Sequence, residues 1–263
     1  MQFARVNGVA LHYADDAGAA PALVFSNSLG TDFRIWDGLV DRLRSRYRLV
    51  RYDKRGHGLS EATPAPYSLD DHVADLAGLL DHLGIRSAAV VGLSVGGMIA
   101  QSLASARPDL VRALVLSNTA HKIGTAEMWD DRIRTVEQQG IGALSAAVMQ
   151  RWFTPEYRRP DNPAFVGYTA MLNRTTAEGY AGTCAALRDA DLTASTAALK
   201  VPTLVIGGDQ DGSTPPDLVK SMADLIEGSQ FHIVQDAGHL PCIEQPDAVA
   251  SLIEDFLGTG GFG

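Results

Sequence analysis

Short apolar runs alternate along much of the chain with longer stretches in which apolar residues recur at helical spacing. Such runs are typical of buried strands, and such stretches of amphipathic helices. The expected strands cover residues 3–6, 9–13, 22–25, 48–52, 88–91, 111–116, 202–206 and 231–234. The expected helices cover residues 33–46, 69–83, 97–106, 216–226 and 246–256. This alternation predicts an α/β fold with a mostly parallel sheet covered on both faces, and Asn7-Gly8 predicts an antiparallel hairpin at one edge.

The pattern changes between residues 121 and 190. Strand-like runs disappear there, and helical segments rich in alanine, methionine, arginine and aromatic residues take over. These segments lie at residues 128–129, 141–153, 165–172 and 180–187. We therefore expect an α/β core of residues 1–120 and 191–263, with residues 121–190 inserted as a helical lid.

Composition excludes some classes of protein. The chain has 263 residues and a net charge of −9, and without a strong basic patch it is not expected to bind nucleic acid. No apolar run is long enough to span a membrane, and the first residues do not resemble a signal peptide. Cys184 and Cys242 are expected to be free thiols in a reducing compartment. Residues 258–263, GTGGFG, are expected to form a frayed end, and nothing in the pattern specifies an oligomeric state.

The pentapeptide Gly92-Leu93-Ser94-Val95-Gly96 stands between an expected strand and an expected helix. A G-x-S-x-G motif in this context forms a sharp turn that lifts the serine hydroxyl above the sheet. Glycines avoid collisions across the turn, and the helix N-terminus directs N–H groups at negative charge near Ser94. The motif predicts a nucleophile at Ser94; the alternative is a glycine-rich turn whose serine caps the helix.

A serine nucleophile needs a base, and the base needs a third group to fix its tautomer. Asp209 and Asp211 follow the strand expected at 202–206, and His239 follows the strand expected at 231–234. The carboxyl ends of parallel strands meet at one edge of a sheet. We therefore expect His239 as the base and either aspartate as the acid, in the chain order serine, aspartate, histidine.

The other histidines are weaker candidates for the base. His12, His72, His82 and His232 lie in expected strands or helices, where a core or surface role is the simpler interpretation. His57 lies in a turn-rich loop, which favours a role in the turn. His121 opens the lid and could face a pocket, but nothing ties it to Ser94.

Four motifs together resemble the α/β-hydrolase superfamily over the full length of the chain. They are the G-x-S-x-G of residues 92–96, the D-x-R-G-x-G-x-S of residues 53–60, the G-x-x-D-x-x-T-P of residues 208–215 and the A-G-H of residues 237–239. The resemblance implies that Asp211, rather than Asp209, is the triad acid. It also implies an oxyanion hole made by the backbone N–H groups of Val95 and Leu29. In much of the superfamily the second loop reads His-Gly-x, whereas residues 27–30 here read Asn-Ser-Leu-Gly.

Three segments are similar to the β-ketoadipate enol-lactone hydrolases, the 3-oxoadipate enol-lactonases of aromatic catabolism. They are residues 26–32 with nearby Trp36, residues 52–60 and residues 91–101. This resemblance implies cytoplasmic hydrolysis of 3-oxoadipate enol-lactone, a small-molecule substrate, with neither a metal nor another cofactor. The residues by themselves indicate serine-dependent hydrolysis of an ester or lactone. Alternatives are another lidded carboxylesterase, a C–C bond hydrolase or a hydrolase-fold receptor, whereas dehalogenases and epoxide hydrolases carry aspartate in place of Ser94.

The substrate implied by the resemblance carries a free carboxylate, so we expect a cationic lid residue beside the pocket. The candidates are Arg132, Arg134, Arg151, Arg158, Arg159, Arg174 and Arg188. Trp129 and Trp152 are candidate apolar walls. We favour Trp129 and Arg132 as substrate-binding residues because they lie early in the lid, near its junction with the core. For each of these residues, a place on a solvated helix face or in the lid interior is the alternative.

Overall fold

Eight strands form a single sheet in the computed structural model, which describes residues 1–17 and 21–259. Their spatial order is β1-β2-β4-β3-β5-β6-β7-β8. The strands are β1 (Gln2–Val6), β2 (Val9–Asp15), β3 (Ala22–Ser26), β4 (Arg48–Tyr52), β5 (Ala88–Leu93), β6 (Val111–Ser117), β7 (Thr203–Gly208) and β8 (Gln230–Val234). The strands from β4 to β8 across this order pair in parallel. This arrangement confirms the predicted α/β fold.

The antiparallel part of the sheet lies at one edge, as the sequence predicts. β1 pairs with β2, and β2 pairs with β4, both antiparallel. Asn7 and Gly8 join β1 to β2 with φ angles of 47° and 77°. A tight hairpin needs two residues in the left-handed region, which is why an Asn-Gly pair suits this turn.

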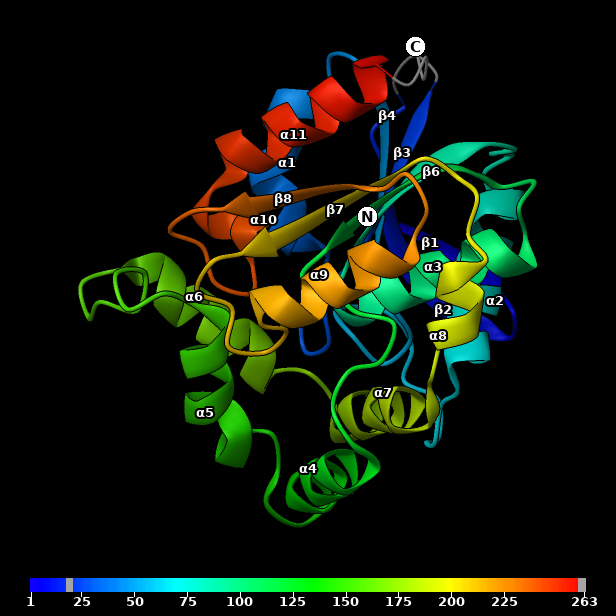
Figure 1. Ribbon diagram of the computed structural model, residues 1–263. Coiled ribbons are helices and arrows are strands. Elements are labelled where there is room, and N and C mark those ends of the chain that lie inside the picture. The colour runs from blue at the N-terminus through cyan, green and yellow to red at the C-terminus, as the bar shows by residue number, and fades with distance from the viewer. Residues whose placement is uncertain (18–20, 260–263) are drawn as a thin grey trace.

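Helices cover both faces of the sheet (Figure 1). On one face lie α1 (Asp37–Leu43) and α11 (Pro246–Thr259), which contact each other. On the other face lie α2 (Leu69–His82), α3 (Val95–Ala106), α8 (Thr193–Ala197) and α9 (Pro216–Leu225). Because helices cover both faces, the central strands β3, β5 and β7 are buried along their whole length.

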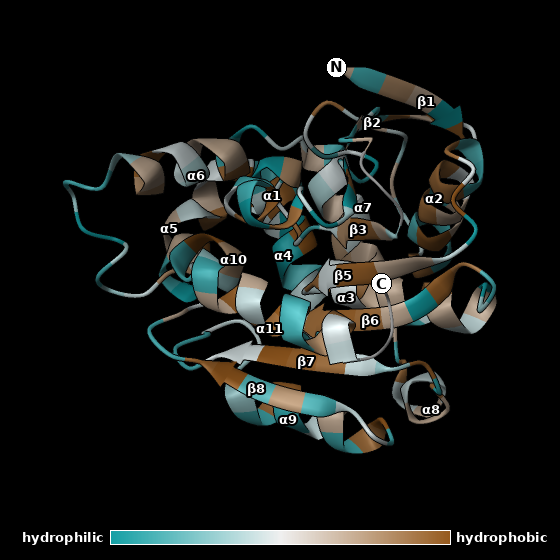
Figure 2. Cartoon of the chain, turned by 90° about the horizontal axis from the view of Figure 1, so that it is seen from above, coloured by the Kyte–Doolittle hydropathy of each residue, from teal (hydrophilic) through white to brown (hydrophobic). Residues whose placement is uncertain are grey.

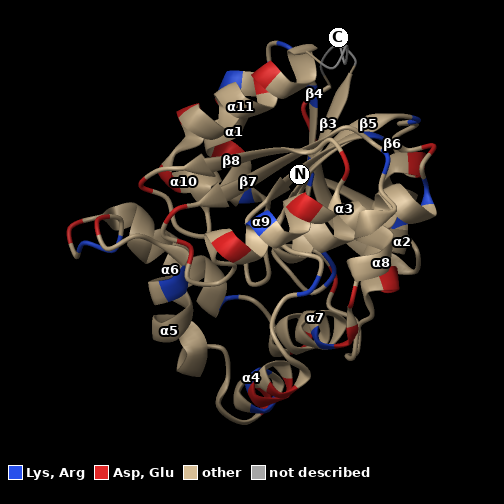
Figure 3. Cartoon of the chain, viewed as in Figure 1, with Lys and Arg blue, Asp and Glu red and all other residues tan. Residues whose placement is uncertain are grey.

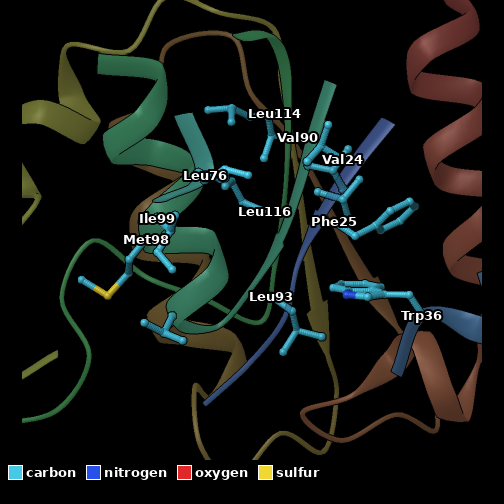
Figure 4. Close-up of a cluster of buried hydrophobic side chains, with 14 of the residues drawn as sticks. Val24, Phe25, Trp36, Leu76, Val90, Leu93, Met98, Ile99, Leu114 and Leu116 are labelled. Carbon is cyan, nitrogen blue, oxygen red and sulfur yellow. The ribbon is translucent and has the colours of Figure 1, made fainter. Parts of the chain in front are cut away.

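The core fills the space between these layers. Figure 4 shows Ile99 and Met98 of α3 on one side of the strands, and Phe25 and Trp36 on the other. The Phe25 and Trp36 rings lie 5.1 Å apart between their centroids. Seen from above, hydrophobic bands run along β5, β6 and β7 between the helices (Figure 2). This buried sheet is the rigid support that holds the loops at its carboxyl edge.

Between β6 and β7 the chain forms a group of helices beyond one end of the sheet, green to yellow-green in Figure 1. They are α4 (Ala126–Gln139), α5 (Gly142–Trp152), α6 (Pro163–Asn173) and α7 (Ala177–Asp189). Residues 121–190 contain no strand. We refer to α4–α7 as the lid. Acidic and basic residues follow one another along α4 (Figure 3), whereas its Trp129 and Val136 are buried.

The lid is joined to the core through close backbone contacts. The carbonyl of Trp152, at the end of α5, accepts the N–H of His239 at 2.7 Å, and the carbonyl of Arg151 accepts the N–H of Gly212 at 3.2 Å. Gly179 of α7 lies so close to Gly56 that a Cβ on Gly179 would collide with the Gly56 carbonyl. The lid therefore helps to hold loops that follow β4, β7 and β8.

Several local predictions need correction. The helix expected at residues 33–46 is split into a 3-10 turn, η1 (Phe33–Trp36), and the short α1. The Asp32 side chain caps the start of η1 at the N–H of Arg34. The sequence pattern did not predict α8 and α10 (Pro241–Glu244), because these helices are too short to show a helical period. The end expected to fray is helical through Thr259, and residues 260–263 lie outside the described residues.

Two predictions from composition are also addressed by the structure. Cys184 of α7 and Cys242 of α10 are free and buried, which confirms the prediction of free thiols. No helix in the described parts of the chain is long and apolar enough to cross a membrane.

Candidate active site

Ser94 occupies the sharp turn between β5 and α3, with φ 58° and ψ −121°. A non-glycine residue adopts this conformation at an energetic cost, and such strain clusters at functional sites. A Cβ on Gly96 would collide with the carbonyl of Ser26, and a Cβ on Gly92 would collide with the backbone of Gly96. The Ser94 side chain makes no capping hydrogen bond to α3. Ser94 therefore occupies the N-cap position of α3, but its side chain does not cap the helix.

Asp211 and His239 meet at the ends of β7 and β8. His239 Nδ1 donates to Asp211 Oδ2 at 2.8 Å. The same carboxylate accepts Asn118 Nδ2 at 2.8 Å, Thr214 Oγ1 at 2.6 Å and the N–H of Ser213 at 2.7 Å. These donors fix the carboxylate, which in turn places the proton of the neutral imidazole on Nδ1 and leaves Nε2 able to accept one.

The protonation of Asp211 follows from opposing effects. Burial by itself raises the pKa of the Asp211 carboxyl, but His239 and the hydrogen bonds from His239, Thr214 and Asn118 outweigh burial and lower the pKa below its ordinary value. Asp211 is therefore ionised at neutral pH and can stabilise a protonated His239 during proton transfer.

The alternative acid and bases lie elsewhere. Asp209 accepts the N–H of Ala237 at 3.0 Å, a local loop contact. His57 Nε2 accepts the N–H of Gly30 at 3.0 Å. Within the described chain, His239 is the one histidine that lines the cavity containing Ser94. The geometry thus places Asp211, and not Asp209, beside this histidine.

A small cavity of about 80 Å³ lies between the core and the lid. Ser94, His239, Ser28 and Leu29 line it from the core side. His239 Nε2 lies 3.4 Å from Ser28 Oγ. Among the described hydrogen bonds there is none between His239 and Ser94, although both line this cavity. Catalytic hydrogen bonds often form or tighten only when substrate is bound. Ser94, in the strained turn, and Ser28, near His239 Nε2, can therefore both be tested as nucleophile.

Leu29 lines this cavity, and Val95 directly follows Ser94, which also lines it. The described hydrogen bonds include no acceptor for the N–H of Leu29 or of Val95. Val95 is the first residue of α3, where N–H groups have no partner within the helix. The neighbouring Gly30 N–H is already bonded to His57. The two remaining donors are suited to stabilise an oxyanion on a substrate held at Ser94.

The structure separates the seven candidate lid arginines. Arg132 and Arg151 line the cavity, together with Trp129 and Trp152. In the described residues, neither guanidinium forms an ion pair with a carboxylate. Arg132 donates to the Tyr180 hydroxyl at 3.5 Å and lies 5.0 Å from the Trp129 ring centroid. Three of the others form ion pairs: Arg134 with Asp131, Arg159 with Glu156 and Asp161, and Arg188 with Asp130 and Asp189. Arg158 donates to the Phe153 carbonyl. Arg174 lines a separate cavity.

A sequence model of the alpha/beta hydrolase fold matches residues 21–246. The chain belongs to the α/β-hydrolase family. It is similar to 3-oxoadipate enol-lactonase 2 of Acinetobacter baylyi, with 37% identity over 94% of this chain and 92% of that protein. It is also similar to 3-oxoadipate enol-lactonase 1 of the same organism, with 36% identity over 90% of this chain and 89% of that protein.

Among solved structures, this α/β hydrolase resembles the enol-lactonase of Burkholderia xenovorans LB400. The two are 39% identical with a TM-score of 0.94, over 98% of this chain and all of that one. These similarities show an ester-hydrolysing enzyme and confirm the resemblance found in the motifs.

Some residues of this hydrolase site escaped the sequence analysis. Asn118, which bonds to Asp211, could have been suspected because it is a polar residue directly after β6, at the carboxyl edge of the sheet. Ser28 contacts His239 and Tyr180 contacts Arg132. No sequence spacing predicts these two contacts, because each joins segments that meet only in the folded chain.

Proposed function

We propose that this enzyme hydrolyses 3-oxoadipate enol-lactone to 3-oxoadipate in the cytoplasm, as part of aromatic catabolism by the β-ketoadipate pathway, with Ser94, His239 and Asp211 as its catalytic triad. The names of the relatives support this substrate. The observation that carries the proposal is the cavity that contains Ser94 and His239 beside two lid arginines. Such a cavity suits a small ester that also bears a carboxylate.

In this proposal the reaction is acyl transfer in two steps. Ser94 Oγ attacks the lactone carbonyl while His239 Nε2 takes its proton, and the oxyanion accepts the N–H groups of Leu29 and Val95. The ring C–O bond then breaks, and His239 returns the proton to the enol oxygen that leaves. The freed enol becomes a ketone. A water molecule, deprotonated by His239, attacks the acyl-enzyme, and protonated His239 returns a proton to Ser94 as the diacid leaves.

The comparison of two substrates tests this proposal. We expect kcat/KM for 3-oxoadipate enol-lactone to exceed that for p-nitrophenyl acetate by about tenfold to a hundredfold. Only the lactone can use a carboxylate subsite, and one charged hydrogen bond is worth about 1.5–3 kcal/mol, which corresponds to this factor. If p-nitrophenyl acetate is the better substrate, the enzyme is a general carboxylesterase. If the enzyme hydrolyses neither of these substrates but hydrolyses a vinylogous product of aromatic ring cleavage, it is a C–C bond hydrolase.

Replacing Arg132 with methionine is expected to raise KM for the enol-lactone about tenfold to a hundredfold. The change keeps an unbranched side chain beside Trp129 but removes the charge proposed to bind the substrate carboxylate. The kcat/KM for p-nitrophenyl acetate should change less than about threefold, because that ester has no carboxylate. Steady-state kinetics with both substrates measures the difference.

Two matched variants complete the Arg132 test. Arg134→Met alters a neighbouring arginine on α4 that pairs with Asp131, and it should leave both substrates unaffected. Arg151→Met tests the second cavity arginine. An equal loss for both substrates in Arg132→Met would contradict a carboxylate-binding role. A loss confined to Arg151→Met would place the subsite at α5 instead.

A further inference from the structure

A lysine lies fully buried beside the loop that carries the Leu29 N–H. Lys54 follows β4 and has no exposed surface. Its Nζ donates to the carbonyls of Asn27 and Ser28, both at 2.9 Å. In the described part of the chain it forms no ion pair with a carboxylate. Neighbouring Asp53 instead accepts bonds from His12 and from the N–H groups of Phe33 and Leu59.

Burying this ammonium group is energetically costly. Lysine is almost never fully buried unless it is paired. Burial lowers the pKa of Lys54 to about 7, against the charges of Asp53 and Asp32, which favour protonation. Among the described hydrogen bonds, the ammonium group in the core donates only to two carbonyls. Its burial lowers the stability of the fold, which burial of an apolar side chain would not do.

The Ser28 carbonyl and the Leu29 N–H belong to one peptide unit. The oxygen of this unit accepts Lys54 Nζ and also Thr31 Oγ1, at 2.9 and 2.8 Å. Donors at the oxygen of an amide polarise the whole unit and make its N–H a stronger donor, and a charged donor does so more effectively. The peptide held by Lys54 is therefore the one that ends in a free N–H at the Ser94 cavity.

His57 holds the next peptide of the same loop. Its Nε2 accepts the Gly30 N–H at 3.0 Å, while its Nδ1 donates to the Arg55 carbonyl at 3.1 Å. Burial, together with the nearby charge of Lys54, holds the pKa of His57 well below its ordinary value, so the ring stays neutral and Nε2 remains an acceptor. Together, Lys54 and His57 occupy the Ser28 carbonyl and the Gly30 N–H, the backbone groups on either side of the Leu29 N–H, which has no acceptor among the described hydrogen bonds.

We propose that Lys54 is a positioning residue for catalysis: through the Ser28 carbonyl it orients and polarises the Leu29 N–H that stabilises the oxyanion. The proposal rests on the role proposed above for Leu29. It assigns a function to a residue that none of the motifs explains, since Lys54 occupies the variable position of D-x-R-G. It is independent of which ester is the natural substrate, because every acyl transfer at Ser94 forms an oxyanion.

The test is Lys54→Met, which keeps an unbranched side chain and removes every donor. With p-nitrophenyl acetate we expect kcat to fall about tenfold to fiftyfold while KM changes less than twofold; deleting an oxyanion donor outright costs a hundredfold to a thousandfold. Phenylboronic acid forms a tetrahedral adduct on a serine nucleophile. Its inhibition constant should rise by the same factor as kcat falls, because its oxygen uses the same donor.

Two more variants separate positioning from general stability. Lys54→Gln keeps an N–H donor and should recover part of the lost kcat, and it serves as the test if Lys54→Met does not fold. Thr196→Val removes the buried 2.7 Å bond from Thr196 Oγ1 to Gln101 Oε1. No described hydrogen bond links these two residues to the Leu29 loop, so this variant should leave kcat unchanged despite lower stability.

The results also distinguish this proposal from the proposed function. The proposal is overturned if folded Lys54→Met keeps kcat within twofold, or if KM rises while kcat and boronate inhibition stay as in the unaltered enzyme. If Lys54→Met does not fold, the proposal is overturned when Lys54→Gln has the same kcat and the same boronate inhibition constant as the unaltered enzyme. Poor turnover of the enol-lactone by the unaltered enzyme would contradict the substrate only and would leave these ester measurements valid.

Discussion

Replacing Ser94 with alanine is expected to lower kcat by about five to six orders of magnitude, for the enol-lactone and for p-nitrophenyl acetate alike. The change removes the atom proposed to attack the carbonyl, and only the residual catalysis of the remaining site survives such a loss. The Ser94 side chain makes no capping hydrogen bond, so the variant should fold normally. Single-turnover kinetics and the absence of an acyl-enzyme in a mass spectrum would measure the effect.

The matched control for this prediction is Ser28→Ala. Ser28 Oγ is the hydroxyl that lies near His239 Nε2, at 3.4 Å. We expect this variant to lose at most about tenfold in kcat, because Ser28 occupies an ordinary loop position rather than the strained turn of Ser94. A loss in Ser28→Ala as large as that in Ser94→Ala would reassign the nucleophile. Full activity in Ser94→Ala would contradict the serine mechanism altogether.

Replacing Asp211 with asparagine is expected to lower kcat about ten-thousandfold. The amide keeps the shape of the carboxylate but cannot hold the imidazole proton on Nδ1 or stabilise its charge. It would also place an N–H₂ group among Asn118 Nδ2 and Thr214 Oγ1, which donate to this carboxylate in the unaltered enzyme. The pH dependence of kcat/KM, with thermal unfolding measured alongside, separates the catalytic loss from a loss of stability.

Asp209→Asn is the control for Asp211. Asp209 accepts only the N–H of Ala237 among the described hydrogen bonds, and an amide oxygen can accept the same bond. We expect kcat to change less than about threefold. A greater loss in Asp209→Asn than in Asp211→Asn would reverse the assignment of the acid.

Features set by local patterns could be predicted from the sequence. The apolar strands, the Asn7-Gly8 turn and the Ser94 turn all depend on residues close together in the chain, and the structure contains each of them. Asp131 and Glu156 stand three positions before Arg134 and Arg159, a spacing that favours ion pairs, and both pairs form. This local spacing could have removed these two arginines from the candidates, whereas Arg132 has no acidic residue three or four positions away.

Contacts between distant segments could not be predicted in this way. Ser28 is 211 positions from His239, and Lys54 is 26 positions from Ser28. No periodicity in the sequence links such pairs, because the order of strands in the sheet and the placement of the loops decide which residues come into contact. Arg132 of α4 and Arg151 of α5 likewise line one cavity, which no local spacing predicts, because it depends on how α5 packs beside α4.

The bonds from the end of α5 to His239 and Gly212 bear on how this enzyme can change. Because the carbonyls of Trp152 and Arg151 help to hold the loops of His239 and Asp211, the helices proposed to select the substrate also help to align the groups proposed to react with it. Exchanging all four helices for those of a relative should therefore disturb turnover of every substrate. Redesign of selectivity is safer when confined to the inner side of α4, with the last turn of α5 kept as it is.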